Sequence, residues 1–362
     1  MKAMIVLVPL FFALSAPAYA QFGVVRRARQ ALDANEKLES LVLNGDEELR
    51  IGAAVSEKVR TRFGVVQDAA VHKYVTLVGR TLAEQSERPA LDWTFIVLDT
   101  DGVNAFAAPG GFVHITRGAL GLIKSEAELA AVLGHEIGHV AHEHTLNAIR
   151  KANAVDLASD AALADRGQFL DRVADFAYDS VLEGKFDRGD ELDADSFAVG
   201  IARKLGYAPG MLADFLGKLA ARNEASQERN GLFASHPETT ERIDSIRKMA
   251  GPTSGAMVPA RYGSAVQYES ADITTVATIT EGPNGPTGSS SDEQADPAPK
   301  RGFGLGALRR AVKPDQQSAQ VSASGGSRGV GPDRLAKGGD NPALVTVTVT
   351  QAELAAFKQG IA

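Results

Sequence analysis

The strongest local signal in the chain is AVLGHEIGHVAHEH, residues 131–144, which holds four of the seven histidines. His135 and His139 stand four residues apart, so on a helix their imidazoles share one face. Glu136 lies between them and can reach the same cavity, and the flanking residues are apolar, which indicates a largely internal helix. This HExxH pattern is typical of a zinc site with two histidine ligands and a glutamate as general base.

The sequence around this motif predicts where its helix begins and what it lacks. Ser125, with Glu128 three residues later, predicts a capping box and a helix start. A catalytic zinc ion needs three protein ligands, and His142 lies about 10 Å along a straight helix from His135. In proteases with HExxHxxGxxH, a glycine turns the chain toward the third ligand; here those two positions hold His142 and Thr145. The third ligand must therefore come from elsewhere, and we expect His142 and His144 to line or buttress the site, or to be surface residues at the helix end.

Glu191 in the segment ELDAD is the best candidate for the third ligand. Glu191 and Asp195 are one helical turn apart on one face, whereas Asp193 points away from it. One carboxylate can bind the metal, and the other can accept the N–H of a ligand histidine and fix its tautomer. The alternative is a solvated acidic helix start that the helix dipole favours.

The segment SHPETTERI contains His236 and Arg242 in front of and inside a predicted helix. A histidine at such a junction can donate to the oxyanion of a scissile carbonyl, or reach the zinc itself and hold a latent state. The third interpretation is an ordinary surface histidine. His72 and His114 have no such partners in the sequence, and we interpret both as structural.

The composition excludes several classes of site and partner. The chain of 362 residues has no cysteine, so disulfides and thiolate metal sites are excluded and a metal must be held by His, Asp or Glu. Its formal net charge of −7 gives no general reason to expect a nucleic-acid partner.

The first twenty residues predict a secretory signal peptide. Lys2 is followed by an apolar run over residues 4–14 and by Ala18-Tyr19-Ala20, which predicts cleavage after Ala20. The alternative is a retained membrane anchor. No later segment has about 18 consecutive apolar residues, so we expect that the mature chain is not an integral membrane protein. A signal of this form suggests a bacterial periplasm.

The rest of the chain favours an α+β, mainly helical fold over residues 21–251. The hydrophobic patterns predict amphipathic helices within 21–91, strands at 93–99 and 111–118 with a turn at 109–111, and helices over 145–183 (with a turn at Gly167), from 188 to Gly206, at 211–223 and after His236.

The composition changes after Gly251. Residues 252–341 are rich in Gly, Ser, Pro, Ala and Thr, which predicts mostly disordered, low-complexity sequence. Residues 342–362 then predict one short strand, ALVTVTVT, and one short helix. These either dock on the body of the protein or offer a strand to the sheet edge of a partner.

Four blocks of this sequence resemble the HtpX/BepA-like zinc metallopeptidases, which include Ste24 and the mitochondrial Oma protease. The resemblance covers residues 45 to 250 and has four parts in the family's order: NAFAAPGGFVHITRGAL, SEAELAAVLGHEIGHVAHEH, GKFDRGDELDAD and SHPETTERI. It implies a zincin-like fold with a small sheet beside the HExxH helix. It also implies one zinc ion held by His135, His139 and Glu191.

The resemblance further assigns roles to neighbouring residues. It implies Asp195 as the outer partner of a ligand, His236 and Arg242 as active-site residues, and 104–116 as a loop and edge strand along which an extended substrate pairs. The implied substrate-binding residues are Asn104, Gly110, Gly111, Phe112, Val113 and His114. The interval between HExxH and Glu191 is polar, unlike in membrane members, and no 34-residue repeat follows, unlike in BepA-like proteins.

The sequence therefore predicts a periplasmic zinc endopeptidase that hydrolyses misfolded or stalled envelope proteins, with links to outer-membrane assembly. Glu136 would activate water, and His236 with Arg242 would stabilise the oxyanion. One alternative is a latent protease that acts mainly as a chaperone or assembly factor. Another is a peptidase for short peptides.

Overall fold

The computed structural model describes residues 43–156, 166–183, 186–226, 239–252, 254–269, 279–282, 285–288 and 341–361. The predicted signal peptide and His236 lie outside these residues, as does most of the predicted low-complexity region. In the described part of the chain, no helix is both long enough and apolar enough to cross a membrane.

A small three-stranded sheet forms the middle of the structure. Strands β1 (Thr94–Leu98) and β3 (Phe112–Thr116) pair in parallel, and β2 (Ala105–Ala108) pairs antiparallel with β3. The order β1-β3-β2 makes β3 central, and η1 (Pro109–Gly111) joins β2 to β3. A separate hairpin joins β4 (Ile279–Gly282) to β5 (Gly285–Gly288).

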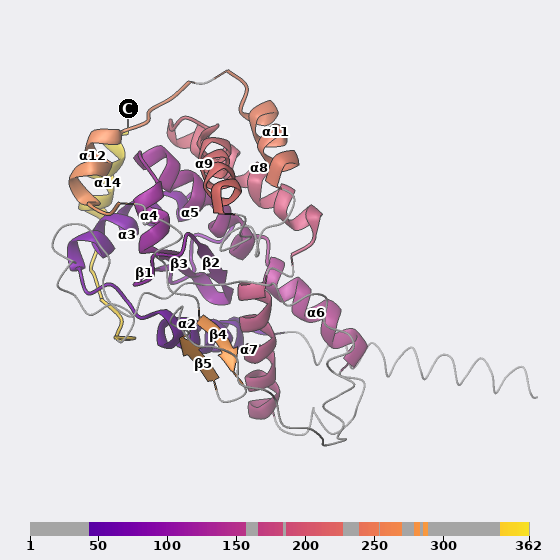
Figure 1. Cartoon of the computed structure of the whole chain (residues 1–362). Helices are drawn as coiled ribbons and strands as arrows, with labels where there is room; N and C mark the ends of the chain where they lie inside the picture. Colours follow the sequence, from indigo (N-terminus) through magenta and orange to yellow (C-terminus); the bar gives the residue numbers. More distant parts are fainter. Residues whose placement is uncertain are drawn as a thin grey trace, which may run out of the picture.

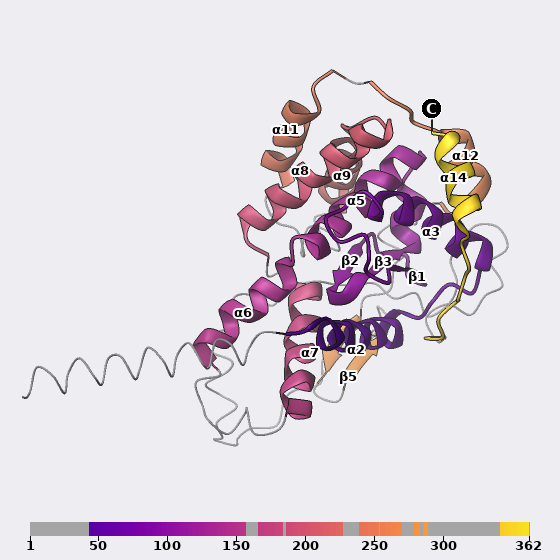
Figure 2. The ribbon, with the colours of Figure 1, turned by 180° about the vertical axis from the view of Figure 1, so that it is seen from behind.

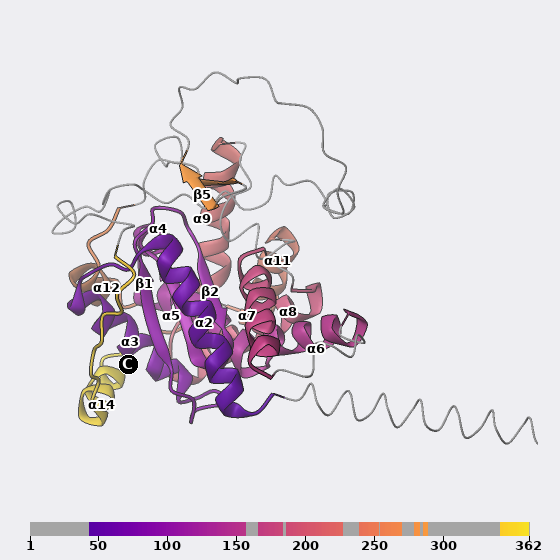
Figure 3. The same ribbon diagram turned by 90° about the horizontal axis from the view of Figure 1, so that it is seen from below.

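Helices cover both faces of the sheet, as Figures 1 and 2 show from opposite sides. Helices α2 (Gly45–Phe63) and α7 (Arg166–Glu183) lie on one face, and Figure 3 shows α2 crossing it. Helices α3 (Ala69–Ala83) and α5 (Glu126–Ala141) lie on the other.

The remaining helices extend these two layers. Short α4 (Arg117–Leu122) follows β3, and α6 (His144–Asp156) leads from the end of α5 toward α7. Helices α8 (Arg188–Leu205), α9 (Met211–Ser226) and α11 (Thr239–Ala250) pack around α5 and one another. The prediction of a mainly helical α+β fold with a small sheet beside the HExxH helix is confirmed.

Alternation along the strands produces two hydrophobic cores. Phe95, Val97, Val113 and Ile115 belong to the larger core with α3, α5, α8 and α9, whereas Ile96 and Leu98 face the core of α2 and α7. Successive strand side chains point to opposite faces, so the short apolar strands supply both cores at once.

Local caps explain where α5 and α8 begin and end. Ser125 accepts from the N–H of Glu128 at 3.2 Å, but the Glu128 carboxylate accepts from Lys124 N and pairs with Lys218, so the predicted capping box is only half formed. Helix α8 begins after Asp187, whose side chain caps it, and ends as predicted at Gly206 with φ 88°. Gly167, predicted to mark a turn, lies inside α7.

The ordered structure extends beyond the predicted boundary at residue 251. Helix α12 (Pro259–Ala265) and the residues after it contribute Tyr262, Val266 and Tyr268 to the larger core, so the prediction of disorder is wrong for residues 254–269. Three apolar residues within a Gly- and Ser-rich segment are too few to reveal this packing by composition.

The C-terminal segment lies against the body of the protein. Residues 341–350 form no strand, which corrects the strand predicted there; they run across the surface, and Arg80 donates to Val349 O at 3.5 Å. Helix α14 (Gln351–Gln359) packs on α3 and places Phe357 in the larger core. The helix therefore docks on the body of the protein, which is one of the two alternatives predicted for the C-terminal segment.

Candidate metal centre

Two glycines in α5 bring α8 close to the HExxH motif. A Cβ atom at Gly138 would lie 3.2 Å from Ala194 Cα, and one at Gly134 would lie 3.4 Å from the Ile201 side chain. Each glycine immediately precedes a histidine of the motif, so the closest approach of the two helices occurs where His135 and His139 face α8.

The side chains of His135, His139 and Glu191 converge on one point between the two helices. The two Nε2 atoms are 3.1 Å apart, and each lies 3.5 Å from an oxygen of Glu191. All three side chains are buried. A tetrahedral zinc ion with bonds of about 2.0–2.1 Å places its ligand atoms roughly 3.3 Å apart. The three groups that the sequence suggested therefore have a spacing that fits such an ion.

Each of these histidines has a partner at its other ring nitrogen. His135 Nδ1 lies 3.0 Å from Asp195 Oδ1, which matches the predicted outer role of Asp195. His139 Nδ1 lies 3.0 Å from His144 Nδ1, a contact that the sequence did not suggest. Both contacts leave the Nε2 atoms directed at the common point.

Arg242 joins the carboxylates of α8 to each other. Its guanidinium donates to Asp195 at 2.8 and 2.6 Å and pairs with Glu191 at 2.7 Å, and its side chain is 3% exposed. Its nearest contact with His135 is 3.4 Å. Burial opposes its charge, but the hydrogen bond to Asp195 and the nearby carboxylates, Glu136 among them, raise the pKa of Arg242. These contacts hold the Arg242 guanidinium between the two carboxylates of α8.

The centre attracts positive charge. Burial and the nearby Arg242 disfavour a protonated His135, yet hydrogen bonds to Asp195 and Glu191 raise the pKa of His135 to about 9. Glu136 is buried on α5 beside His135. A group of buried carboxylates that holds a proton on an imidazole in the absence of a metal is suited to a divalent cation.

Most of the predicted substrate-binding residues lie in a different setting from the one expected. Phe112, Val113 and His114 are on β3, which pairs on both sides, so the prediction that they line an edge is wrong. His114 is fully buried and hydrogen-bonds with Ser56 at 2.9 Å, which favours the structural interpretation. The edge strand of this sheet beside α5 is β2.

The turn before β3 is also occupied by internal contacts. The Gly110 N–H donates to Glu48 at 2.9 Å, and both Gly110 and Gly111 have positive φ, which favours glycine. Asn104 uses its side-chain oxygen to accept from the Ala105 N–H at 2.9 Å.

Two features of the site were missed, and the sequence contains a signal for the first of them only. Glycines at 134 and 138, four apart in mid-helix, indicate a close helix contact, because glycine is costly there without a packing reason. The contact of His144 with His139 depends on the chain turning at Glu143, which has φ 57°. A straight helix, as assumed in the sequence analysis, would not produce it.

Comparison with known proteins places the described geometry in context. Residues 69–250 match the family described as Peptidase family M48. A putative beta-barrel assembly-enhancing protease of Vibrio cholerae is 27% identical over 216 residues, covering 57% of this chain and 44% of that protein. The metalloprotease YcaL of Escherichia coli is 33% identical over 152 residues, covering 41% of this chain and 58% of that protein.

The alignment with a third relative covers a larger part of this chain. The beta-barrel assembly-enhancing protease of Escherichia coli is 24% identical over 261 residues, covering 69% of this chain and 52% of that protein. The chain thus spans about half the length of these curated relatives.

Proposed function

The chain belongs to peptidase family M48, and from this membership and the site geometry we propose that it is a zinc-dependent metalloendopeptidase. The observation that carries the proposal is the spacing of the three converging side chains, 3.1 Å between the two Nε2 atoms and 3.5 Å from each to an oxygen of Glu191. His135, His139 and Glu191 would hold one zinc ion, leaving a fourth position open. When bound, the ion polarises a carbonyl and lowers the pKa of water beside it.

The surrounding residues would prepare and carry the proton transfers. Glu136 follows a ligand histidine directly and would take the proton of the attacking water and pass it to the leaving amine. Asp195 would hold the proton of His135 on Nδ1, so that Nε2 stays available for the ion. Arg242 would position Glu191 and Asp195 and offset their charge, which makes it a positioning residue. The oxyanion role of His236 stays a prediction.

We propose that the substrate is an extended polypeptide that pairs with the edge strand β2. Thr116 N donates to Asn104 O, so alternation turns the backbone groups of Ala105 and Ala107 away from β3. Because Asn104 already caps the Ala105 N–H, the outward pair is that of Ala107, which is 4% exposed, so pairing requires the segment that covers β2 to move aside. Strand β2 packs against α5, so a paired chain would run beside the metal centre. Backbone pairing reads little sequence and suits unfolded chains.

The proposed setting is the bacterial periplasm, and the proposed substrates are misfolded or stalled envelope proteins. Two relatives carry names that refer to beta-barrel assembly, which supports a link to that process. The predicted signal peptide with cleavage after Ala20 agrees with this compartment.

The proposal is tested by incubating the zinc-loaded protein with an unfolded model protein, beside Glu136→Gln and His135→Ala. We expect Glu136→Gln to keep its zinc and to lose cleavage by about 10²–10⁴-fold, because general acid–base catalysis is removed while the ligands remain. His135→Ala should lose the zinc ion of the metal centre together with cleavage. Full cleavage by Glu136→Gln would overturn the assignment of the base, and unchanged zinc content in His135→Ala would overturn the ligand set.

A second candidate is a latent protease that acts mainly as a chaperone or assembly factor. The assembly-related names of the relatives favour it. A chain that suppresses aggregation of an unfolded outer-membrane protein equally well as wild type and as Glu136→Gln would support this candidate. Loss of that effect in Glu136→Gln would exclude it.

A further inference from the structure

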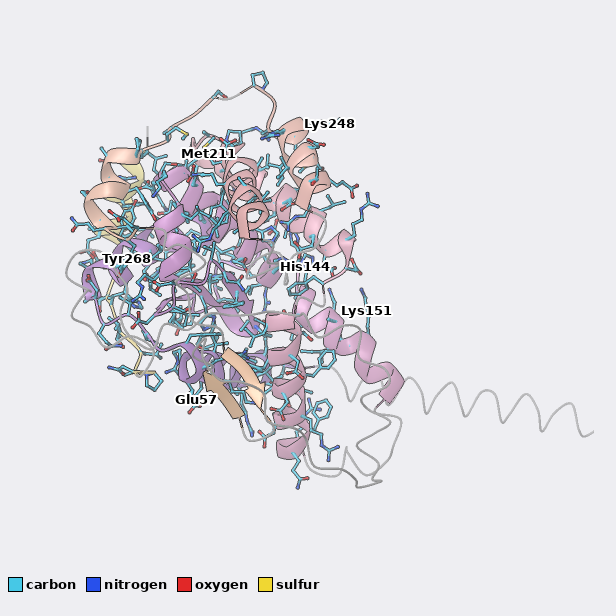
Figure 4. The ribbon with its side chains drawn as sticks, in the orientation of Figure 1. Glu57, His144, Lys151, Met211, Lys248 and Tyr268 are labelled. Carbon is cyan, nitrogen blue, oxygen red and sulfur yellow. The ribbon has the colours of Figure 1, made fainter. Side chains whose placement is uncertain are left out.

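Three more potential metal ligands meet on the other side of His139. His142, His144 and Asp193, here called the outer cluster, each offer a ligand atom, and these atoms all lie within 4.8 Å of one another. The turn at Glu143 follows the C-cap of α5 at His142 and lets α6 begin at His144, which directs both imidazoles toward Asp193 on α8. Figure 4 shows His144 where α6 begins, beside the start of α8.

The outer cluster carries excess negative charge. Asp193 Oδ2 lies 3.2 Å from His144 Nε2 and is also in close contact with His142 Nδ1. Two further carboxylates approach, Asp190 at 3.9 Å from His144 Nε2 and Glu87 at 3.7 Å from His142 Nε2. Within the described residues, the ion-pair partners of Asp193 are these two histidines alone, and neither lysine nor arginine is among them. A divalent ion would supply the positive charge that this carboxylate otherwise lacks.

Solvent can reach the outer cluster, unlike the buried metal centre. The side chain of Asp193 is 51% exposed and that of His142 is 26% exposed, whereas His144 is 5% exposed. An ion could therefore enter at Asp193 and His142 while His144 connects the cluster to the interior.

The geometry points to a second binding site for a divalent transition-metal ion such as Zn²⁺ at His142, His144 and Asp193, and we propose that this ion opposes the one in the metal centre. Imidazole and carboxylate ligands suit zinc. The opposition rests on the proposed function, because it requires an ion at His135, His139 and Glu191. It acts through the 3.0 Å contact between His139 Nδ1 and His144 Nδ1.

The opposition follows from where a neutral imidazole carries its single hydrogen. An ion on His139 Nε2 leaves the hydrogen on Nδ1, which donates to Nδ1 of His144. His144 must then carry its own hydrogen on Nε2, directed at Asp193, and this nitrogen is not free to bind metal. An ion on His144 Nε2 instead puts a hydrogen on its Nδ1, so that two N–H groups face each other. Each ion therefore weakens the other, and by linkage the effect is reciprocal.

The outer cluster consequently has two states with different effects. With a proton on His144 Nε2, the contacts from Asp193 through His144 to His139 orient a ligand of the metal centre. With an ion in the outer cluster, the hydrogen bond from His139 Nδ1 to His144 Nδ1 is lost. Loss of such an outer partner typically lowers metal affinity or activity by about 10–100-fold. Excess zinc would thus slow an enzyme that limiting zinc activates, even while the metal centre stays filled.

The test measures bound zinc per chain, by equilibrium dialysis and elemental analysis, against free zinc concentration. The purified full chain is compared with His142→Gln, Asp193→Asn and His135→Ala. His142→Gln is the informative variant, because it removes an outer ligand and leaves the contacts among His139, His144 and Asp193 intact. Circular dichroism confirms that each variant is folded. Cleavage of an unfolded protein is followed in parallel over the same zinc range.

We expect two zinc ions per wild-type chain and one in each of the three variants. Wild-type cleavage should fall tenfold or more as the second ion binds, while cleavage by His142→Gln stays within about twofold. If wild type and His142→Gln bind equal amounts of zinc, the outer site is overturned, although loss of zinc in His135→Ala would still uphold the proposed function. If the second ion binds but inhibits both proteins equally, the opposition through His144 is overturned.

Discussion

The metal centre and the sheet region both bury histidines completely, yet their surroundings give these histidines opposite properties. His114, between the sheet and α2, has a serine hydroxyl as partner, and burial lowers its pKa to about 3. His135 is equally inaccessible, but carboxylates on α8 raise its pKa to about 9. Burial alone therefore does not make a histidine functional; the charge that the fold places around it does.

The same contrast holds for two buried arginines. Arg117 in the sheet region pairs with Asp99 and with Asp101, the latter at 2.9 Å, and Arg242 in the metal centre pairs with Asp195 and Glu191. Both bridges connect carboxylates that would repel each other. The second has imidazole nitrogens of His135 beside it, so there an added cation can take over the role of the guanidinium.

The largest expected effect is on stability. Replacing either arginine with methionine should lower the free energy of unfolding of the metal-free protein by about 3–5 kcal/mol, because carboxylates remain buried without their partner. Urea denaturation measures it. Added zinc should restore part of the lost free energy of unfolding in Arg242→Met and none in Arg117→Met. Equal recovery in both variants would contradict the contrast between the two arginines. Arg188→Met, at an exposed pair with Glu241, is the control with less than about 1 kcal/mol expected.

The next effect concerns zinc affinity. Asp195→Asn should lower it by about 10–100-fold, because the amide no longer fixes the His135 tautomer. Competition with a chromophoric chelator gives the affinity. Asp101→Asn is the control, because it weakens the buried pair of Asp101 with Arg117 as Asp195→Asn weakens that of Asp195 with Arg242. The folded Asp101→Asn variant should bind zinc with the affinity of the wild type. A similar loss of affinity in both variants would show that general destabilisation, and not the hydrogen bond to His135, is responsible.

The acid sensitivity of the sheet region gives a third prediction. His72 and His114 are buried neutral, and burial is the main cause that lowers the pKa of each. The folded pKa of each lies below the unfolded value of about 6.5, so their contribution is complete above pH 6.5 and is lost as the pH falls, for His114 toward its pKa of about 3. We expect about 2 kcal/mol of stability to be lost by pH 5 through His114.

This loss is measured by urea denaturation of the metal-free protein between pH 7.5 and 4.5. His114→Gln should be less stable at neutral pH but should show a flatter dependence over this range. An unchanged slope would mean that other groups cause the acid sensitivity. His135 has the opposite sign: its contribution in the metal-free protein is complete below pH 6.5 and is lost as the pH rises through about 9.

The smallest effect separates the two glycines of α5. Gly138→Ala should cost about 1 kcal/mol or more and weaken zinc binding, because its Cβ would meet Ala194 Cα at 3.2 Å and the Phe197 side chain at 3.2 Å. Gly134→Ala makes only ordinary contacts from 3.4 Å upward and should gain up to about 1 kcal/mol of helix propensity. Thermal unfolding with and without zinc compares them. Equal behaviour of the two variants would mean that the helix contact is not what sets the site.

Much of the fold and of the candidate site could be predicted from local patterns in the sequence. The spacing of His135 and His139, the helix stop at Gly206 and the apolar strand at 94–98 are each visible within a few residues. The pairing of Glu191 with this motif could be proposed only as one of two alternatives, since ELDAD also reads as a solvated helix start. The order of the strands was not accessible, which is why Phe112 to His114 were assigned to an edge.

By itself, the sequence determined which chemical groups are present and which of them share a helix face, because both depend on covalent order and helical periodicity. The tertiary structure decided which groups meet. The contact of α5 with α8, which joins Gly138 to Ala194 across 56 positions of the chain, brings Glu191 to the histidines, and the turn at Glu143 brings His144 to His139. Such distances depend on the packing of side chains from distant segments, which no local pattern encodes.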